Sequence, residues 1–322
     1  MAAPVGIGVL GGRSFVATRA VMPAIEASER AVIAAVASAG GAVPDPWAAH
    51  AVDSYAAVIE HPDVEAVYVP LPNGMHAEWV GAAAAAGKAV LCEKPLARDA
   101  DEARSMAEVA RRGGVLLAEA WMTPFDPRWS AVLDQARSGS IGEITHVDAA
   151  FTFTIPDSAA DNYRWRADQG GGALLDVGIY CLGAAVELWG AEPETVVATV
   201  ERTAGGVDAT TDATLTWTGG RSAHVRCSFV EDERQTLELV GTRGRLRLDT
   251  DAHTGGADTL AHVDEAGDAH DELVEPGDPY LGMIDAFADA VRGDAEWSRP
   301  VERSIELMSL LDRITAAGNA PT

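Results

Sequence analysis

The sequence predicts an α/β protein: a Rossmann-type doubly wound parallel sheet followed by an α+β domain with an open, mainly antiparallel sheet. In the first third, short apolar runs alternate with stretches long enough for helices, the pattern of a parallel sheet with crossover helices. From about residue 141 the apolar residues recur at every second position, as in a half-buried antiparallel sheet. A glycine-rich turn follows the first apolar run.

The first domain is expected to span residues 1–122. Its strands are predicted from apolar runs at Val5–Leu10, Ala31–Ala37, Ala66–Val69, Val90–Cys92 and Val115–Ala118. One helix is expected from about His76 to Ala86, ending at Gly87. Another begins after Asp99, which forms a capping box with Glu102, and ends at Gly113-Gly114.

The second domain is expected to span residues 123–300. Its longest strand is predicted at Ile144–Ile155, where the odd positions are mostly apolar. The same alternation returns at Leu215/Trp217, Val225/Cys227/Phe229, Leu237/Leu239 and Leu246/Leu248, with glycine turns at 219–220 and 241–244. Helices are predicted at Tyr280–Val291 and Val301–Ala317. Residues 301–322 are expected to form a C-terminal helix that packs back on the first domain.

Composition excludes several classes of protein. Among 322 residues, 49 acidic and 24 basic side chains give a formal charge of -25, which repels nucleic acid and anionic membranes. Cys92, Cys181 and Cys227 lack metal-ligand spacing, so we expect free thiols in a reducing compartment and no metal site. No uninterrupted apolar run has membrane-spanning length, and the N-terminus lacks a basic region. A cytoplasmic protein that binds small molecules is expected.

The glycine-rich turn is typical of a dinucleotide site. A literal G-x-G-x-x-G at Gly6, Gly8 and Gly11 begins inside the first strand, where no phosphate can meet a helix N-terminus. The useful frame is the G-x-S-x-x-A sequence at 12–17, which lies between strand and helix. The expected cofactor contacts in this turn are Gly11, Gly12, Arg13, Ser14, Phe15 and Val16.

Lys94 indicates proton chemistry. The chain has only two lysines, Lys88 and Lys94, and Lys94 directly follows a predicted buried strand. An ammonium group can release or share a proton, whereas a guanidinium group effectively cannot. A purely structural alternative is that Lys94 extends from the strand end or pairs with Glu93.

Four motifs together resemble a known family. They are the glycine-rich turn, the Pro72-Asn73-x-x-His76 segment, the Glu93-Lys94-Pro95 motif, and the segment from Gly170-Gly171-Gly172 to Asp176 and Tyr180. Nearly the whole chain resembles the glucose-fructose oxidoreductase, inositol dehydrogenase and MocA family. Tyr180 is similar to the branch with dihydrodiol dehydrogenase, NADP-dependent xylose dehydrogenase and deoxysugar 3-ketoreductase. The resemblance implies an NAD(P)-dependent oxidoreductase that transfers hydride to or from a CH-OH/C=O carbon of a sugar, ketosugar or cyclic diol.

The expected catalytic residues are Lys94, Asp176 and Tyr180. Asp176 and Tyr180 are four residues apart at the start of a predicted helix, so both project from one face, which we expect to meet Lys94 across an interdomain cleft. A phenol with its ordinary pKa near 10 needs a nearby cation to act as a base at neutral pH. The resemblance implies that Lys94 contacts the reacting oxygen and that Asp176 holds the substrate. The resemblance leaves open whether Tyr180 or Lys94 moves the proton. Alternatively, Tyr180 packs in the core and Asp176 complements the helix dipole.

Further residues are assigned to binding. Cofactor contacts are also expected from Ser38, Pro72, Asn73, His76, Glu93 and Lys94, and substrate contacts from Trp121 and Trp165. The second strand ends in Ala37-Ser38-Ala39-Gly40 without an acidic residue, so NADP(H) is favoured over NAD(H), with Ser38 and Arg13 near the 2'-phosphate. Thr123, Pro124 and Asp126 replace the Tyr, Arg and His that relatives carry, which predicts an altered pocket.

Two other functions remain open: a non-catalytic NAD(P)-binding sugar-pathway regulator, and an NAD-dependent glycoside hydrolase of the same fold. The resemblance also implies a homodimer or homotetramer formed through the antiparallel sheet. The three polar residues Lys94, Asp176 and Tyr180 argue against the regulator, because a sensor needs no proton relay.

Overall fold

The structure is a computed structural model that describes residues 3–255 and 259–319. The chain divides into two compact units. Unit 1 contains Met1–Met122 and Tyr280–Ile305, and unit 2 contains Thr123–Pro279 and Glu306–Thr322. Residues 280–300, which the sequence analysis assigned to the second domain, therefore group with unit 1.

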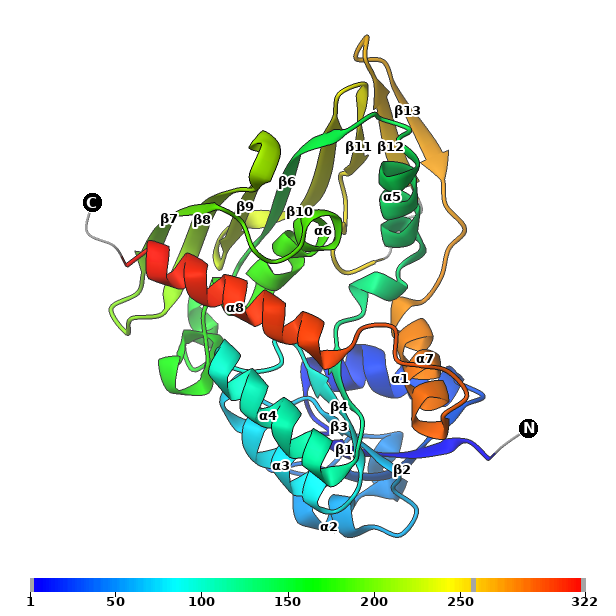
Figure 1. Cartoon of the computed structure of the whole chain (residues 1–322). Coiled ribbons are helices and arrows are strands. Elements are labelled where there is room, and N and C mark those ends of the chain that lie inside the picture. Colours follow the sequence, from blue (N-terminus) through cyan, green and yellow to red (C-terminus); the bar gives the residue numbers. More distant parts are fainter. Residues whose placement is uncertain (1–2, 256–258, 320–322) are drawn as a thin grey trace. The chain divides into compact units, whose positions relative to one another are not determined.

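Unit 1 is built on a parallel sheet (Figure 1). In the described residues the strands are β1 (Val5–Leu10), β2 (Ala31–Ala37), β3 (Ala66–Val69), β4 (Ala89–Glu93) and β5 (Leu117–Ala120). Their order is β2-β1-β3-β4-β5, and every pairing is parallel. β1, β3, β4 and β5 are buried throughout, as expected for strands with both faces covered. The Rossmann-type sheet predicted from the sequence is confirmed.

On the outer side of β2, where a Rossmann fold has its third strand, the described residues form a single β-bridge. Ala51 pairs in parallel with Val36, and the backbone N–H of Val52 donates to the carbonyl of Val36 at 2.9 Å. With this bridge counted as the outermost strand, the sheet has the order 3-2-1-4-5-6 of dinucleotide-binding folds. The sheet order reverses between β1 and β3, so a ligand is expected at the carboxyl ends of these strands.

Helices flank the unit 1 sheet (Figure 1). They are η1 (Ala17–Val21), α1 (Met22–Ala27), η2 (Trp47–His50), α2 (Tyr55–Glu60), η3 (Asn73–Met75), α3 (His76–Ala85), α4 (Ala100–Gly113) and α7 (Pro279–Arg292). Asp99 caps α4 by accepting from the N–H of Glu102 at 2.8 Å, and Gly114 ends it at φ 65°, both as predicted. α7 is held in unit 1 by a 2.5 Å hydrogen bond from Ser28 to Asp285.

Unit 2 is built on a mainly antiparallel sheet. Its described strands are β6 (Ile144–Thr154), β7 (Thr195–Arg202), β8 (Asp208–Thr216), β9 (Ser222–Ser228), β10 (Val230–Gly241), β11 (Gly244–Leu248), β12 (Thr259–Asp264) and β13 (Ala269–Leu273). The order is β13-β12-β11-β10-β6-β9-β8-β7, and β6 and β9 form a parallel pair while the other printed pairings are antiparallel. This part of the fold prediction is also confirmed.

One face of the unit 2 sheet carries the core. Helix α6 (Ile179–Trp189) packs against β6 and β9, and α5 (Pro127–Ser138) packs against β11 and β12. Short helices complete the unit: η4 (Thr123–Phe125), η5 (Asp157–Ala159), η6 (Tyr163–Trp165), η7 (Ala167–Gln169), η8 (Leu174–Gly178) and η9 (Thr218–Gly220). The final helix α8 (Val301–Ala317) begins in unit 1 and ends in unit 2.

The segment Ala167–Trp189 differs from one expectation. Among the described residues it is long and apolar enough for a membrane-spanning helix. The sequence analysis expected no uninterrupted apolar run of that length, and Asp176 and Glu187 do interrupt this one. Burial covers 78% of its most apolar window. Its last part, α6, packs on the sheet, so the segment has the surroundings of a core helix.

Candidate active site

The glycine-rich turn lies at the carboxyl end of β1. The N–H groups of Gly11 and Gly12 both donate to the carbonyl of Ala37, each at 2.9 Å, which ties the turn to β2. Gly11 has φ 84°, and a Cβ on Gly12 would lie 2.3 Å from Val36 Cγ1. Side chains are excluded at both positions, which leaves a backbone cradle of the kind that a pyrophosphate fills. Gly6 and Gly8 lie inside β1, as predicted.

Two residues of the turn point outward. Phe15 is 80% exposed, and its expected contact with the cofactor stays a prediction. The Arg13 guanidinium reaches the loop that follows β2, with Nη1 3.4 Å from the carbonyl oxygen of Ala42. Ser38 begins this same loop directly after β2. Arg13 therefore reaches the loop that contains Ser38. A dinucleotide in this fold places its adenosine ribose at that loop.

His76 is a structural residue. It is fully buried, with Nε2 2.8 Å from the carbonyl oxygen of Leu71 and Nδ1 3.2 Å from that of Leu96. Burial lowers its pKa, so the neutral ring donates through one nitrogen. The ring thus joins the loops after β3 and β4. The cofactor contact expected of His76 stays a prediction, while Pro72 and Asn73 precede it on the first of these loops.

Glu93 and Lys94 lie where β4 ends. The Tyr68 hydroxyl donates to Glu93 Oε1 at 2.7 Å, and the N–H of Lys94 lies 3.2 Å from Glu93 Oε2. Burial raises the pKa of Glu93 to about 7, which places its ionisation near neutral pH. Lys94 is half-buried, one residue beyond the strand.

Glu119 supports the Lys94 loop and was missed in the sequence analysis. Its Oε1 accepts from the N–H of Leu96 at 2.9 Å, and its Oε2 accepts from the Ser304 hydroxyl at 2.6 Å. Glu119 is buried in β5. A carboxylate inside an otherwise apolar strand was the signal that could have identified it, because a buried charge requires partners.

Asp176 and Tyr180 lie in unit 2 on consecutive turns of one helical segment. Asp176 is in the π-helical turn η8 and Tyr180 in the first turn of α6. They are 6% and 7% exposed, and the other buried residues of these turns are apolar or glycine. Two polar side chains thus interrupt an apolar helix start, where burial alone would disfavour them.

An aromatic cluster holds the Tyr180 ring. The ring centroid lies 5.5 Å from that of Phe151 on β6 and 6.1 Å from that of His253. Phe151 and His253 stack on each other at 5.7 Å. Burial lowers the pKa of His253 to about 4, so the imidazole is neutral at physiological pH. Tyr180 therefore sits against an uncharged surface on this side.

Arg164 is the second residue that the sequence analysis missed. Its Nε donates to Asp176 Oδ2 at 2.6 Å, and Nη2 lies 3.5 Å from Oδ1. The two residues are twelve positions apart on different short helices, so periodicity could not pair them. The available signal in the sequence was that Arg164 directly precedes Trp165, which was itself a candidate site residue.

The tryptophan candidates differ in position. Trp121 is 1% exposed, and the Arg299 guanidinium lies 4.3 Å from its ring centroid, so Trp121 lies in the core of unit 1, and its expected substrate contact stays a prediction. Trp165 is half-buried and meets Phe229 edge to face at 5.5 Å, which supports packing.

The residues that replace the family pattern are internal. Thr123 donates to the carbonyl of His253 at 2.9 Å. Asp126 accepts from the N–H of Arg128 at 2.8 Å and pairs with its guanidinium at 3.2 Å. Both side chains are buried, and the altered pocket that they predict is not tested by these contacts.

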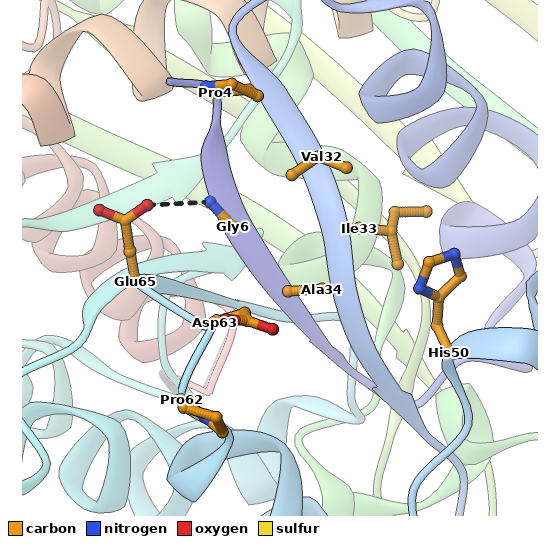
Figure 2. Close-up of a pocket in the computed structure, with 9 residues that line it drawn as sticks. All are labelled: Pro4, Gly6, Val32, Ile33, Ala34, His50, Pro62, Asp63 and Glu65. Atoms are coloured by element: carbon orange, nitrogen blue, oxygen red, sulfur yellow. Dashed lines mark hydrogen bonds between the residues drawn. The ribbon is translucent and has the colours of Figure 1, made fainter. Parts of the chain in front are cut away.

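A cavity of about 550 Å³ lies elsewhere on unit 1 (Figure 2). It is lined by Pro4, Gly6, Val32, Ile33, Ala34, His50, Pro62, Asp63 and Glu65. Gly6 belongs to the amino-terminal end of β1, and the N–H of Gly6 donates to Glu65 at 3.2 Å. Because Gly11 and Lys94 follow the carboxyl ends of their strands, this cavity is distinct from the nucleotide edge.

The fold and these groups define a nicotinamide-dependent oxidoreductase: a dinucleotide cradle with Lys94 at the same sheet edge, and a second unit that buries a phenol and a carboxylate. A family model described as "Oxidoreductase family, NAD-binding Rossmann fold" matches residues 5–120. A model of the GFO/IDH/MocA C-terminal domain matches residues 129–247. The chain belongs to the GFO/IDH/MocA family, as its motifs predicted.

Individual relatives are similar over nearly their full lengths. The chain is 40% identical to the dTDP-3,4-didehydro-2,6-dideoxy-alpha-D-glucose 3-reductase of Saccharopolyspora spinosa, over 91% of this chain and 89% of the relative. It is 35% identical to the NADP(+) D-xylose 1-dehydrogenase 2 of Haloferax volcanii, over 94% of each. A crystal structure of a 3-ketoreductase from Actinomadura kijaniata with NADP and TDP-benzene has a TM-score of 0.90 at 33% identity, covering 98% of each chain.

Proposed function

We propose that this protein uses NADPH to reduce the ketone of a ketosugar that is carried on a nucleoside diphosphate. Relatives at 40% and 35% identity are named as reductases of a dTDP-linked didehydro-dideoxyglucose. The similar ketoreductase structure contains NADP and a TDP derivative. The second candidate function is oxidation of a free aldose with NADP⁺, because one relative is named as a D-xylose dehydrogenase.

The observation that carries the proposal is the pair of polar groups in an apolar helix start. Asp176 and Tyr180 are nearly buried among apolar neighbours. A helix whose purpose was packing alone would gain stability from apolar residues at both positions. Retention of a carboxylate and a phenol there supports proton and hydrogen-bond chemistry, which a cofactor-binding regulator does not need.

Each residue then has one role. The bound cofactor supplies the hydride that adds to the ketone carbon. Tyr180 gives its phenolic proton to the ketone oxygen, so that the product is an alcohol and the phenolate is later reprotonated from water. Lys94 donates a hydrogen bond to the same oxygen and stabilises the negative charge that develops there. Asp176 accepts a hydrogen bond from a neighbouring sugar hydroxyl and orients the ring.

The residues of unit 1 fit NADP(H). The turn at Gly11 and Gly12 leaves room only for backbone, as a pyrophosphate requires. Arg13 extends to the loop that begins with Ser38, and neither the end of β2 nor the next residues carry a carboxylate that would repel a 2'-phosphate. Arg13 and Ser38 are assigned to that phosphate.

A substrate panel tests the proposal. Purified protein is mixed with NADPH or NADH and a set of 3-ketosugars, free and dTDP-linked, and with NADP⁺ against aldoses, inositols and trans-diols. Reduced-nicotinamide absorbance should fall fastest with NADPH and a dTDP-linked ketosugar. Turnover of free D-xylose alone would favour the second candidate. Tight NADPH binding with no turnover of any compound would favour a regulator. Cleavage of nitrophenyl glycosides without net absorbance change would indicate a glycoside hydrolase.

The proposal also covers the cellular compartment and the oligomeric state of the protein. Cys92, Cys181 and Cys227 are free and buried, which suits a reducing cytoplasm. The sheet face opposite α6 carries ion pairs between neighbouring strands, such as Arg226 Nη1 to Asp212 at 2.8 Å. We assign this polar face to a homodimer or homotetramer contact. Light scattering at several protein concentrations measures the oligomeric state, and a monomer at all concentrations contradicts it.

A further inference from the structure

Arg164 touches one proposed site residue and lies within electrostatic range of another. Besides its 2.6 Å contact with Asp176, its side chain is 29% exposed, so it is only partly open to solvent. Burial opposes the charged form, but the Asp176 carboxylate and, more weakly, the phenols of Tyr163 and Tyr180 raise the pKa of Arg164. Arg164 is therefore a fixed cation in this corner of unit 2.

The glycine run before the helix sets the position of Arg164. The N–H of Gly172 donates to the Arg164 carbonyl at 3.0 Å, and the N–H of Gly171 donates to the Arg166 carbonyl at 2.9 Å. A Cβ on Gly171 would lie 2.4 Å from the Arg164 carbonyl oxygen. Asn162 caps the same turn by accepting from the N–H of Arg164 at 3.0 Å. The backbone of Arg164 is thus docked on the segment that leads to Asp176.

A second acidic group, Asp208, secures the helix start. Asp208 accepts from the N–H of Leu174 at 2.7 Å, and a Cβ on Gly172 would lie 2.1 Å from Asp208 Oδ1. Gly172 has φ 128°, which side chains rarely adopt. The second and third glycines therefore permit two close approaches, by the Arg164 loop and by Asp208. Both approaches orient the turn that carries Asp176.

A carboxylate beside a phenol creates an electrostatic problem. The negative charge of Asp176 disfavours a second negative charge on Tyr180, four residues on, which forms when the phenol gives up its proton. In unit 2, Arg164 interacts electrostatically with Asp176, Tyr163 and Tyr180, and the ring centroid of His253 lies 6.1 Å from that of Tyr180. His253 is neutral above a pH of about 4. Arg164 is the group among these that can balance Asp176.

We propose that Arg164 is a positioning residue for the proposed reduction: it orients the Asp176 carboxylate toward a sugar hydroxyl and offsets its charge at Tyr180. This inference rests on the proposed function. Nε of Arg164 donates to Asp176 Oδ2 at 2.6 Å and Nη2 lies 3.5 Å from Oδ1, so the guanidinium fixes the direction of the carboxylate. Arg164 acts through Asp176 and Tyr180 and does not itself handle the reacting atoms.

Steady-state kinetics of variants give the first test. Arg164→Gln should lower kcat roughly 10- to 100-fold, the span of a lost charge-assisted contact, with a smaller change in KM for NADPH. Arg164→Lys should recover part of kcat, because charge remains without the planar fork. Arg166→Gln is the matched control, since Arg166 pairs with exposed Asp168 at 2.7 Å on the same loop. It should behave like the wild type.

Gly171→Ala moves the loop without removing a charge. The added methyl group must displace the Arg164 carbonyl, so this variant should lower kcat in the same direction as Arg164→Gln. Circular dichroism and the thermal midpoint show whether each variant folds. Gly171→Ala and Arg164→Lys keep the test available if Arg164→Gln does not fold.

A spectroscopic titration makes the test independent of turnover. Tyrosinate absorbance is followed with pH, and the wild-type curve minus the Tyr180→Phe curve isolates Tyr180 among five tyrosines. In the Arg164→Gln background the same difference should move up by about one pH unit, because Asp176 is no longer balanced. An unmoved titration together with wild-type kcat would overturn the positioning role. Wild-type protein that reduces no compound, with the titration shifted as expected, would instead count against the proposed function alone.

Discussion

The hydroxyl of Tyr68 donates a 2.7 Å hydrogen bond to Oε1 of Glu93, inside the sheet of unit 1 and one residue before Lys94. Burial raises the pKa of Tyr68 well above its usual range, so Tyr68 remains the donor. Burial also raises the pKa of Glu93 to about 7, and the charge of Lys94 and the hydrogen bond from Tyr68 partly offset this. A carboxyl group that titrates near neutral pH thus adjoins the proposed catalytic lysine.

We expect Glu93 to make stability depend on pH. The pKa of Glu93 in the folded protein, about 7, lies above its ordinary value of 4.5. Its contribution to the free energy of unfolding is therefore complete below pH 4.5 and is lost as the pH rises through about 7. The total loss is about 3 kcal/mol. Glu93→Gln should flatten this loss, measured as chemical-denaturation midpoints at pH 5 and pH 8. Tyr68→Phe should move the loss to higher pH. Equal pH dependence in Glu93→Gln and wild type would contradict the assignment.

Lys94→Met should reduce kcat by about 10²- to 10⁴-fold while NADPH binding stays nearly intact, because the lost group is the one that we propose acts on the reacting oxygen. The chain offers one matched control. Lys88→Met removes the other lysine, whose ammonium donates to the Val64 carbonyl at 2.6 Å. Single-turnover absorbance and fluorescence titration with NADPH separate the two effects. Wild-type turnover by Lys94→Met would remove Lys94 from the mechanism.

Arg13→Gln should raise the KM for NADPH roughly 10-fold and leave the KM for NADH unchanged, since only NADPH carries the 2'-phosphate. Arg19→Gln, an exposed arginine on the following helix, serves as control. The ratio of kcat/KM with the two cofactors is the measured quantity. A proportional loss with both cofactors would show instead that Arg13 contacts a part that they share.

His253 should make unit 2 sensitive to acid. Burial lowers its pKa from 6.5 to about 4, so its stabilisation is complete above 6.5 and is lost as pH falls, by about 2 kcal/mol at pH 5. His253→Gln keeps a donor for the Ala150 carbonyl but does not titrate. Denaturation midpoints at pH 7 and pH 5 should lie closer together in this variant. Exposed His50→Gln should leave the difference unchanged.

The sequence predicted the buried strands well because their apolar runs report burial directly. β1, β2 and β3 have the predicted bounds. β5 lies two residues later than predicted, at Leu117–Ala120, and includes Glu119, a polar residue whose partners Leu96 and Ser304 an apolar run does not reveal. β12 and β13 were not predicted, since β13 is exposed throughout and has no apolar period.

The site could be predicted only in part. Motif order identified Lys94, Asp176 and Tyr180, whose shared role remains a proposal. Local sequence could not show that the His76 ring lies between the carbonyl groups of Leu71 and Leu96, or that Arg164 pairs with Asp176 across twelve residues. Such contacts depend on how loops fold back, and neither periodicity nor capping signals encode that.

The chain returns to unit 1 after completing most of unit 2, through Tyr280–Ile305, before α8 ends in unit 2. A gene fragment cut after Met122 would therefore lack α7, whose Met283, Ile284 and Phe287 are fully buried. To express unit 1 by itself, residues 1–122 and 280–305 must therefore be joined by a linker in one chain. A simple truncation would yield an exposed apolar surface prone to aggregate.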